Sequence, residues 1–191
     1  MPKQMVEIKF DEKRLRGIQK MLRSIPNGMP KVMTWAINRT ATSAKAGIVK
    51  SIAGEVNVKQ KSIRTRITKE KATYSSWQAR LGISTKRISL ISFKGTSQTK
   101  KGVGYRIDAG GARKLVPSAF IGTPRRTGFA GVLKRMSKHR YPLAWLRGPS
   151  LGHIFEEAPS VVKEVTESTS EKLVKNIDTR IKYLLEKHRA K

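Results

Sequence analysis

The chain has 191 residues, with 41 lysines and arginines against 13 aspartates and glutamates and a formal net charge of +28. It contains no cysteine, which excludes disulfides, cysteine–zinc sites and thiol catalysis. No stretch approaches the roughly 18 consecutive apolar residues of a membrane span, and residues 1–10 lack the apolar segment of a signal peptide, so we expect a soluble protein made in the cytoplasm.

Two apolar patterns with helical spacing come first. Residues 11–25 predict one helix, which the sequence Pro26-Asn27-Gly28 ends. A longer helix is predicted from Pro30 to Gly54, and its many small residues would let another backbone approach closely.

A short third helix is predicted next. Asn57 and Gln60 have the spacing of a capping box, and Ile63 and Ile67 would form its apolar side.

The period then changes from about 3.6 to two, which is typical of strands. Residues 77–83 alternate between apolar and polar positions, and 88–93 form a second, more ambiguous apolar run. Residues 94–104 are rich in Gly, Ser, Thr and Lys, which predicts an exposed, mobile loop.

Two strand pairs are predicted after this loop. Residues 103–107 and 112–121 flank a hairpin connection at 108–111. Residues 129–136 and 141–147 form another pair, whose second strand contains Pro142 and should therefore lie near a sheet edge.

A long apolar stripe predicts a final helix over residues 159–188. The order of elements predicts an α+β fold with N-terminal helices, a central antiparallel β-sheet and a long C-terminal helix. We expect one domain over 1–191, divided into a helical part (1–70), a basic antiparallel sheet (74–148) and the terminal helix.

The positive charge is concentrated in the middle of the chain. Residues 57–148 hold 22 lysines and arginines but only two acids, Glu70 and Asp108, a formal net charge of +20. The same segment contains many large apolar residues, which indicates a folded region and not a disordered basic tail. Such a surface repels itself unless a polyanion lies against it, and nucleic acid is the leading candidate.

The candidate phosphate contacts form four clusters, any one of which alone could be an ordinary solvated face. The predicted nucleic-acid-binding residues are Lys59, Lys61, Arg64, Arg66, Lys86, Arg87, Lys100, Lys101, Arg125, Arg126, Lys134, Arg135, Lys138 and Arg140. No helix-turn-helix, zinc finger or RNP aromatic motif accompanies them, so we expect contact with phosphates, independent of sequence and sensitive to salt. The three tryptophans, Trp35, Trp77 and Trp145, are expected to pack in the core and not to stack on bases.

Few residues could support catalysis. His153 with Glu156 and Glu157 has metal-ligand types at helical spacing, but a surface histidine beside an acidic pair is the favoured interpretation. The basic segment lacks the carboxylate cluster of a metal-dependent nuclease, and its glycine runs match no nucleotide-binding motif. We therefore expect no enzyme activity, no metal and no cofactor.

Several short motifs resemble the phage minor tail protein Z family. The segment 36–44, with the sequence Ala-Ile-Asn-Arg at its start, precedes a basic helix and a basic Gly/Ser/Lys loop, as in that family. Residues 116–121 resemble its "PGAFI"-like strand, and 140–143 its "RYP" motif, in the same order and near the same spacing. Ser118 stands where the family often has glycine. The resemblance covers roughly residues 30–160.

The resemblance implies a virion protein of a long-tailed phage that completes the tail at its head-proximal end and helps to seat the genome end. Similar proteins form rings, commonly sixfold, so the implied partners are other copies, the genomic DNA end, and tail and neck proteins such as the tail terminator and tape measure. The helix over 159–188 and the second helix could serve either subunit contacts or intramolecular packing.

Two other function classes remain open. A stand-alone, sequence-independent nucleic-acid-binding protein would carry the same charge without a ring. Alternatively, the basic surface could meet an acidic protein, and the cue for that would be a basic patch with aromatic anchors.

Overall fold

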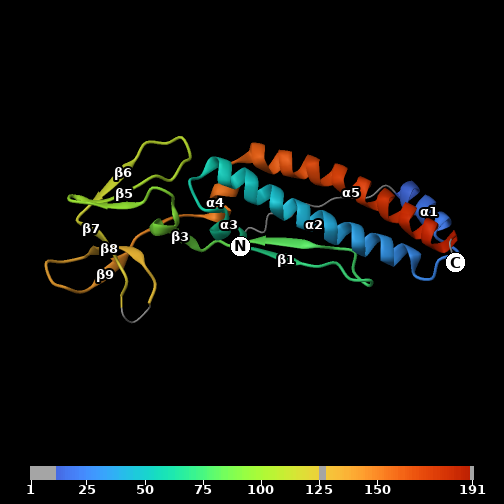
Figure 1. The fold of residues 1–191 in the computed structure, drawn as a ribbon, viewed down its shortest axis with the longest axis horizontal. Coiled ribbons are helices and arrows are strands. Elements are labelled where there is room, and N and C mark those ends of the chain that lie inside the picture. Colours follow the sequence, from blue (N-terminus) through green and yellow to red (C-terminus); the bar gives the residue numbers. More distant parts are fainter. Residues whose placement is uncertain (1–11, 125–127, 190–191) are drawn as a thin grey trace. The chain divides into compact units, whose positions relative to one another are not determined.

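The structure of the chain, a computed structural model, describes residues 12–124 and 128–189. It divides into two compact units: unit 1 comprises residues 1–48, 67–82 and 162–191, and unit 2 comprises 49–66 and 83–161 (Figure 1). Each unit is thus assembled from separate segments of the chain. The expectation of a single domain over 1–191 stays a prediction.

Unit 1 is built around three of the predicted helices. They are α1 (Glu12–Met21), α2 (Gly28–Glu55, up to residue 48 in this unit) and α5 (Pro159–Arg189, from residue 162). Their apolar faces meet in one core, which contains Ile18, Leu22, Val32, Met33, Ala36, Ile37, Ala72, Leu173, Ile177, Ile181 and Leu184. The predicted helices and the terminal stripe are confirmed, and in unit 1 the stripe packs within the chain.

α2 lies between α5 and a pair of short strands, β1 (Ile67–Glu70) and β2 (Arg80–Ile83) (Figure 1). On the α5 side, the Asn176 side-chain amide donates to Thr40 Oγ1 at 2.9 Å. On the strand side, Asn38 Nδ2 donates to the Ala72 carbonyl at 3.0 Å, and the Ala72 N–H donates to Asn38 Oδ1 at 2.9 Å. One helix therefore anchors two layers through polar side chains.

The third helix is shorter than predicted. α3 spans Gln60–Arg64, and Lys59 precedes it without a side-chain capping bond, so the predicted capping box is wrong. The Asn57 amide instead donates to the Lys94 carbonyl at 2.7 Å, a long-range bond that local sequence does not reveal. Ile67 is likewise not on this helix, because it begins strand β1.

Unit 2 contains most of the strands. They are β3 (Arg87–Ser89), β4 (Ser97–Thr99), β5 (Gly102–Tyr105), β6 (Lys114–Pro117), β7 (Ala119–Gly122), β8 (Gly131–Arg135), β9 (Leu143–Trp145) and β10 (Arg147–Ser150), with the 3₁₀ turn η1 (Leu90–Ser92) and helix α4 (Leu151–Glu156). The strands pair antiparallel in the orders β10-β3, β4-β5-β6 and β7-β8-β9. The α+β class is confirmed, and the strands form several small sheets instead of one.

The segment 94–104 is a hairpin, so the predicted mobile loop is wrong. β4 pairs with β5, and Gly102, Val103 and Gly104 are buried. A side chain at Gly102 would place its Cβ 2.0 Å from the Val116 carbonyl oxygen of β6, and its φ is +153°. The glycine here serves close strand pairing and not mobility.

The predicted strand 112–121 is broken at Ser118. This residue has φ of +60°, in the left-handed region that favours glycine, and it separates β6 from β7. The two strands therefore belong to different sheets. The Gln98 side chain of β4 connects these sheets, since its Oε1 accepts from the Ile121 N–H at 2.8 Å and its Nε2 donates to the Ala119 carbonyl at 3.3 Å.

The last predicted strand pair is confirmed as β8 and β9, with β9 at a sheet edge as expected from Pro142. Trp145 of β9 covers Gly131 of β8 so closely that a Cβ on this glycine would lie 2.1 Å from the indole ring. Trp145 is half-buried, as is Trp35.

Trp77 differs from the prediction. It lies before β2, which begins only at Arg80, and its side chain is 39% exposed. Its indole Nε1 donates to the Tyr74 carbonyl at 3.1 Å within the same turn. The predicted strand from residue 77 and the core position of Trp77 are therefore wrong.

Candidate nucleic-acid interface

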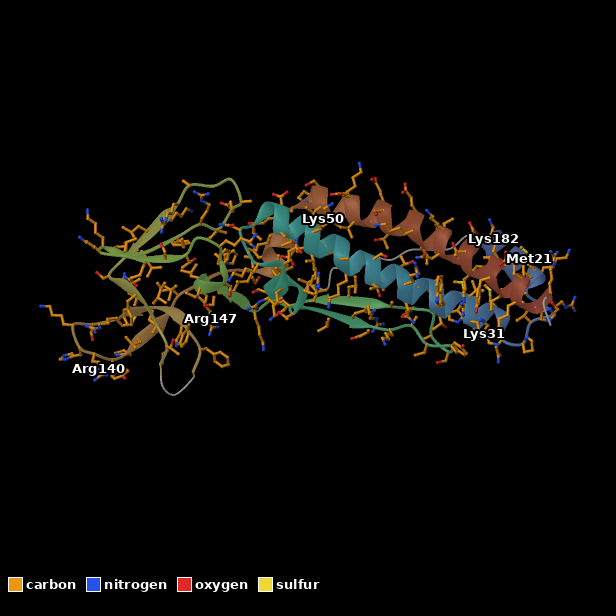
Figure 2. All side chains as sticks on the ribbon, viewed as in Figure 1. Met21, Lys31, Lys50, Arg140, Arg147 and Lys182 are labelled. Carbon is orange, nitrogen blue, oxygen red and sulfur yellow. The ribbon has the colours of Figure 1, made fainter. Side chains whose placement is uncertain are left out.

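All fourteen predicted phosphate contacts belong to unit 2. Arg125 and Arg126 lie outside the described residues. Of the other twelve, Arg66 and Lys134 are half-buried and the rest are exposed. By sequence, unit 2 holds 20 lysines and arginines against four acids, a formal net charge of +16. Figure 2 shows Arg140 near the end of a loop and Arg147 at the start of β10.

One hollow gathers four of the cations on the sheet β4-β5-β6. It has a volume of about 400 Å³ and is lined by Lys100, Lys101, Arg113 and Lys114 among others. These cations come from different ends of β5: Lys100 and Lys101 form the turn from β4 to β5, whereas Lys114 pairs with Tyr105 at the other end. Among the residues that the structure describes, no carboxylate lines this hollow, which we call the β4–β6 hollow.

Gly104 positions Arg113 in the β4–β6 hollow. A Cβ on Gly104 would lie 2.5 Å from Arg113 Nε, so the guanidinium rests directly on the strand backbone. Arg113 Nη2 also donates to Ser97 Oγ across the sheet. Sequence reasoning missed Arg113 and Lys114, although their place in a predicted strand opposite a glycine-rich one was a usable signal.

The cluster around α3 is partly structural. Arg66 Nη1 donates to the Lys86 carbonyl at 3.1 Å, and the Ser84 N–H donates to the Arg66 carbonyl at 3.0 Å. Arg66 thus ties the end of α3 to the segment that carries Lys86 and Arg87. Lys61 and Arg64 of α3 are exposed, whereas Arg66 is half-buried.

The last cluster surrounds the β8–β9 connection. Lys134 and Arg135 end β8, and the Arg135 guanidinium lies 5.9 Å from the centre of the Phe120 ring. Arg140 lies 5.8 Å from the Tyr141 ring centre. Such cation–π contacts orient both guanidiniums without neutralising them. The structure does not bring this cluster into the β4–β6 hollow.

The histidine considered as a metal ligand has a structural setting. Ser150 caps α4 by accepting from the His153 N–H at 3.2 Å, and His153 Nε2 lies 3.2 Å from Glu157 Oε1. Residues 12–124 and 128–189 contain no group of three or more His, Cys, Asp or Glu side chains placed to hold a metal ion. In the same ranges, no helix has both the length and the apolar character needed to cross a bilayer.

Comparison with known proteins gives one match. The family model of prophage minor tail protein Z (GPZ) matches residues 13–187. Searches of curated proteins and of solved structures found no match.

Proposed function

Because the chain belongs to the prophage minor tail protein Z family, we propose that it completes the tail at its head-proximal end. Family membership makes it a structural protein of the phage tail and thus a virion component. In the proposal, copies of the chain form a closed ring, sixfold to match the tail, and unit 2 faces the end of the packaged DNA.

The β4–β6 hollow is the observation that carries this proposal. It brings four cations into one hollow on a unit of strong positive charge, with no carboxylate among the described residues that line it. Close cations repel one another unless an anion lies between them, so bound phosphates would stabilise the arrangement. A DNA end supplies phosphates at high density, and their condensed counterions are released on contact.

The chemistry of the hollow favours backbone contact over base reading. Lysine and arginine at a shallow sheet surface meet phosphate oxygens, which carry no sequence information. A tail protein that holds whichever genome end arrives needs this kind of binding. No catalytic step is part of the proposal, and the proposed protein partners are the tail terminator and the tape measure.

The test is DNA binding by a variant that lacks the cations of the hollow. In Lys100→Gln/Lys101→Gln/Arg113→Gln/Lys114→Gln, we expect at least about tenfold weaker binding to a short duplex at 100 mM salt. The slope of log affinity against log salt should fall by roughly three to four, because each lost phosphate contact removes about 0.9.

A matched control removes the same charge elsewhere. Four exposed lysines of α5 are suited to it: Lys163, Lys172, Lys175 and Lys182. Their replacement by Gln should change the affinity less than about threefold. Equal losses in the two quadruple variants would mean that net charge alone attracts DNA, and the proposal of a built interface would be rejected.

A further inference from the structure

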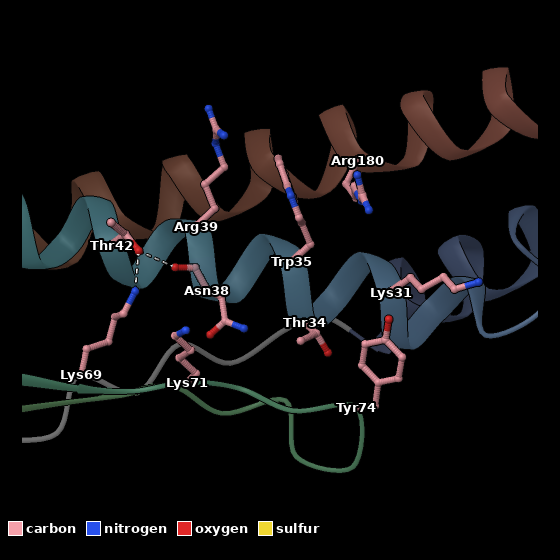
Figure 3. Close-up of a pocket in the computed structure, with 10 residues that line it drawn as sticks. All are labelled: Lys31, Thr34, Trp35, Asn38, Arg39, Thr42, Lys69, Lys71, Tyr74 and Arg180. Carbon is pink, nitrogen blue, oxygen red and sulfur yellow. Dashed lines mark hydrogen bonds between the residues drawn. The ribbon is translucent and has the colours of Figure 1, made fainter.

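A groove runs along α2 in unit 1, and its lining includes Lys69 and Lys71 of the basic segment 57–148 (Figure 3). It has a volume of about 510 Å³ and no acidic lining residue. Its positive charges come from three elements: Lys31, Arg39, Lys69, Lys71 and Arg180. Lys69 and Lys71 approach α2 from the strand side, and Arg180 comes from α5 (Figure 3). We call this site the α2 groove.

The arginines of the α2 groove are held by aromatic rings. Arg39 and Arg180 lie 5.1 Å and 5.2 Å from the Trp35 ring centre, and Arg180 lies 4.8 Å from that of Tyr183. Arg180 Nε is buried and has no hydrogen-bond partner in the described part of the chain. A guanidinium that aromatic rings orient and leave charged is suited to an incoming carboxylate, which would bind at the terminal nitrogens because Nε is buried.

The same unit carries a matching acidic surface. Glu164, Glu167 and Glu171 are exposed on α5, at spacings of three and four residues that place them on one helix face. That face lies opposite the buried Val165 and Leu173. No lysine or arginine of the described residues forms an ion pair with these three carboxylates, which we call the glutamate stripe.

We propose that the α2 groove of one copy receives the glutamate stripe of a second copy. The stripe spans about 10 Å of helix, and the α2 residues that line the groove, 31–42, span about 16 Å. Within one copy, Arg180 follows Glu171 by about 13 Å along α5, and no ion pair joins the two surfaces. Two different surfaces on one chain give a head-to-tail contact, which forms a ring when the rotation between neighbouring copies closes. The inference rests on the proposed oligomer and names its interface.

DNA fits the α2 groove less well. Sites for single-stranded DNA stack bases on aromatic rings, whereas Trp35 already has two guanidiniums within 5.2 Å of its ring centre. A helix of about 10–12 Å diameter can instead lay three glutamates along the groove. An acidic foreign protein would offer the same chemistry, but the glutamate stripe is an acidic helix that this chain itself supplies.

Charge reversal within one chain tests the pairing. Arg39→Glu/Lys71→Glu changes the groove, Glu167→Lys/Glu171→Lys changes the stripe, and Lys182→Glu/Lys187→Glu is a control elsewhere on α5. Sedimentation velocity of the full chain should show an oligomer for wild type and control. In each reversed variant, the dissociation constant of the oligomer should be more than about tenfold higher than in the wild type. An equimolar mixture of the two reversed variants should restore the oligomer. The new glutamates in the groove of one variant then face the new lysines in the stripe of the other.

The outcomes separate the alternatives. Lys71→Glu alone guards against misfolding of the double variant, since Lys71 is exposed, and it should weaken assembly in the same direction. If the reversed variants assemble as wild type does, the pairing is rejected while the proposed ring remains. If they assemble normally but lose affinity for duplex DNA or for an acidic tail protein, that ligand occupies the groove instead. A wild type that stays monomeric overturns both the pairing and the ring, whereas the DNA test of the β4–β6 hollow stands apart from either.

Discussion

Removing the Asn38 side chain should release the segment around Ala72, which long-range hydrogen bonds from Asn38 hold against α2. Asn38 lies on α2 in the Ala-Ile-Asn-Arg motif, and its amide makes both hydrogen bonds of the Ala72 peptide groups. Ala72 is buried at 4% exposure. In Asn38→Ala, a backbone N–H and a carbonyl would therefore remain in the protein interior without partners.

The expected cost follows from those two groups. A buried polar group left unsatisfied costs about 1–3 kcal/mol, and partial access of water reduces that figure. The Thr34 hydroxyl, one turn before Asn38, still donates to the Thr73 carbonyl at 3.1 Å and limits the movement. We expect a loss of about 2–4 kcal/mol, or roughly 4–16 °C in Tm for a chain of this length.

Thermal unfolding and hydrogen exchange would measure the effect. Gln78→Ala, which removes an exposed amide in the same unit, is the control and should change stability by less than about 0.5 kcal/mol. In Asn38→Ala the Ala72 amide should exchange faster than in wild type. Equal stability of the two variants, with Ala72 still protected, would refute the role assigned to Asn38.

Backbone geometry in unit 2 gives two more predictions. Ser118→Gly should stabilise the protein by about 0.5 kcal/mol in urea unfolding, because relief of the left-handed conformation slightly exceeds the entropy cost of glycine; a destabilised variant would contradict this. Gly131→Ala should lower the free energy of unfolding by about 1–3 kcal/mol, because the added methyl group would lie 2.1 Å from the Trp145 ring. Gly54→Ala is the control, since nothing lies within 4 Å of its Cβ. A Gly131 variant as stable as the control would show that Trp145 moves aside freely.

The helices could be predicted because their cores follow the period of the sequence. The stripe that includes Leu173, Ile177 and Ile181 repeats at helical spacing, and these side chains fill the core of unit 1. The family motif gains a physical explanation from the structure: Ala36 and Ile37 are buried, Asn38 clamps Ala72, and Arg39 covers Trp35.

The sites could be predicted only in part, because they depend on pairing between distant strands. Composition correctly marked Lys100 and Lys101 as exposed, but it could not show that Arg113 and Lys114 line the same hollow, because that depends on how distant segments fold together. The glycines of residues 94–104 led to the wrong prediction of a mobile loop, since a residue without a Cβ permits tight packing as readily as motion. The α2 groove was missed because it joins Lys69 and Lys71 of the basic segment to Arg180, which reaches it from α5, outside that segment.

The separation of contacting residues has a consequence for how the protein is made. Thr40 and Asn176 meet although they are 136 positions apart in the sequence. At about 5–20 residues per second, the ribosome needs roughly 7–27 s to supply the second partner after the first has emerged. During that interval the apolar side of α2 has no terminal helix to cover it. A nonsense mutation shortly before residue 162 would make this exposure permanent, and such a product should be a target for chaperones or proteases instead of a smaller working protein.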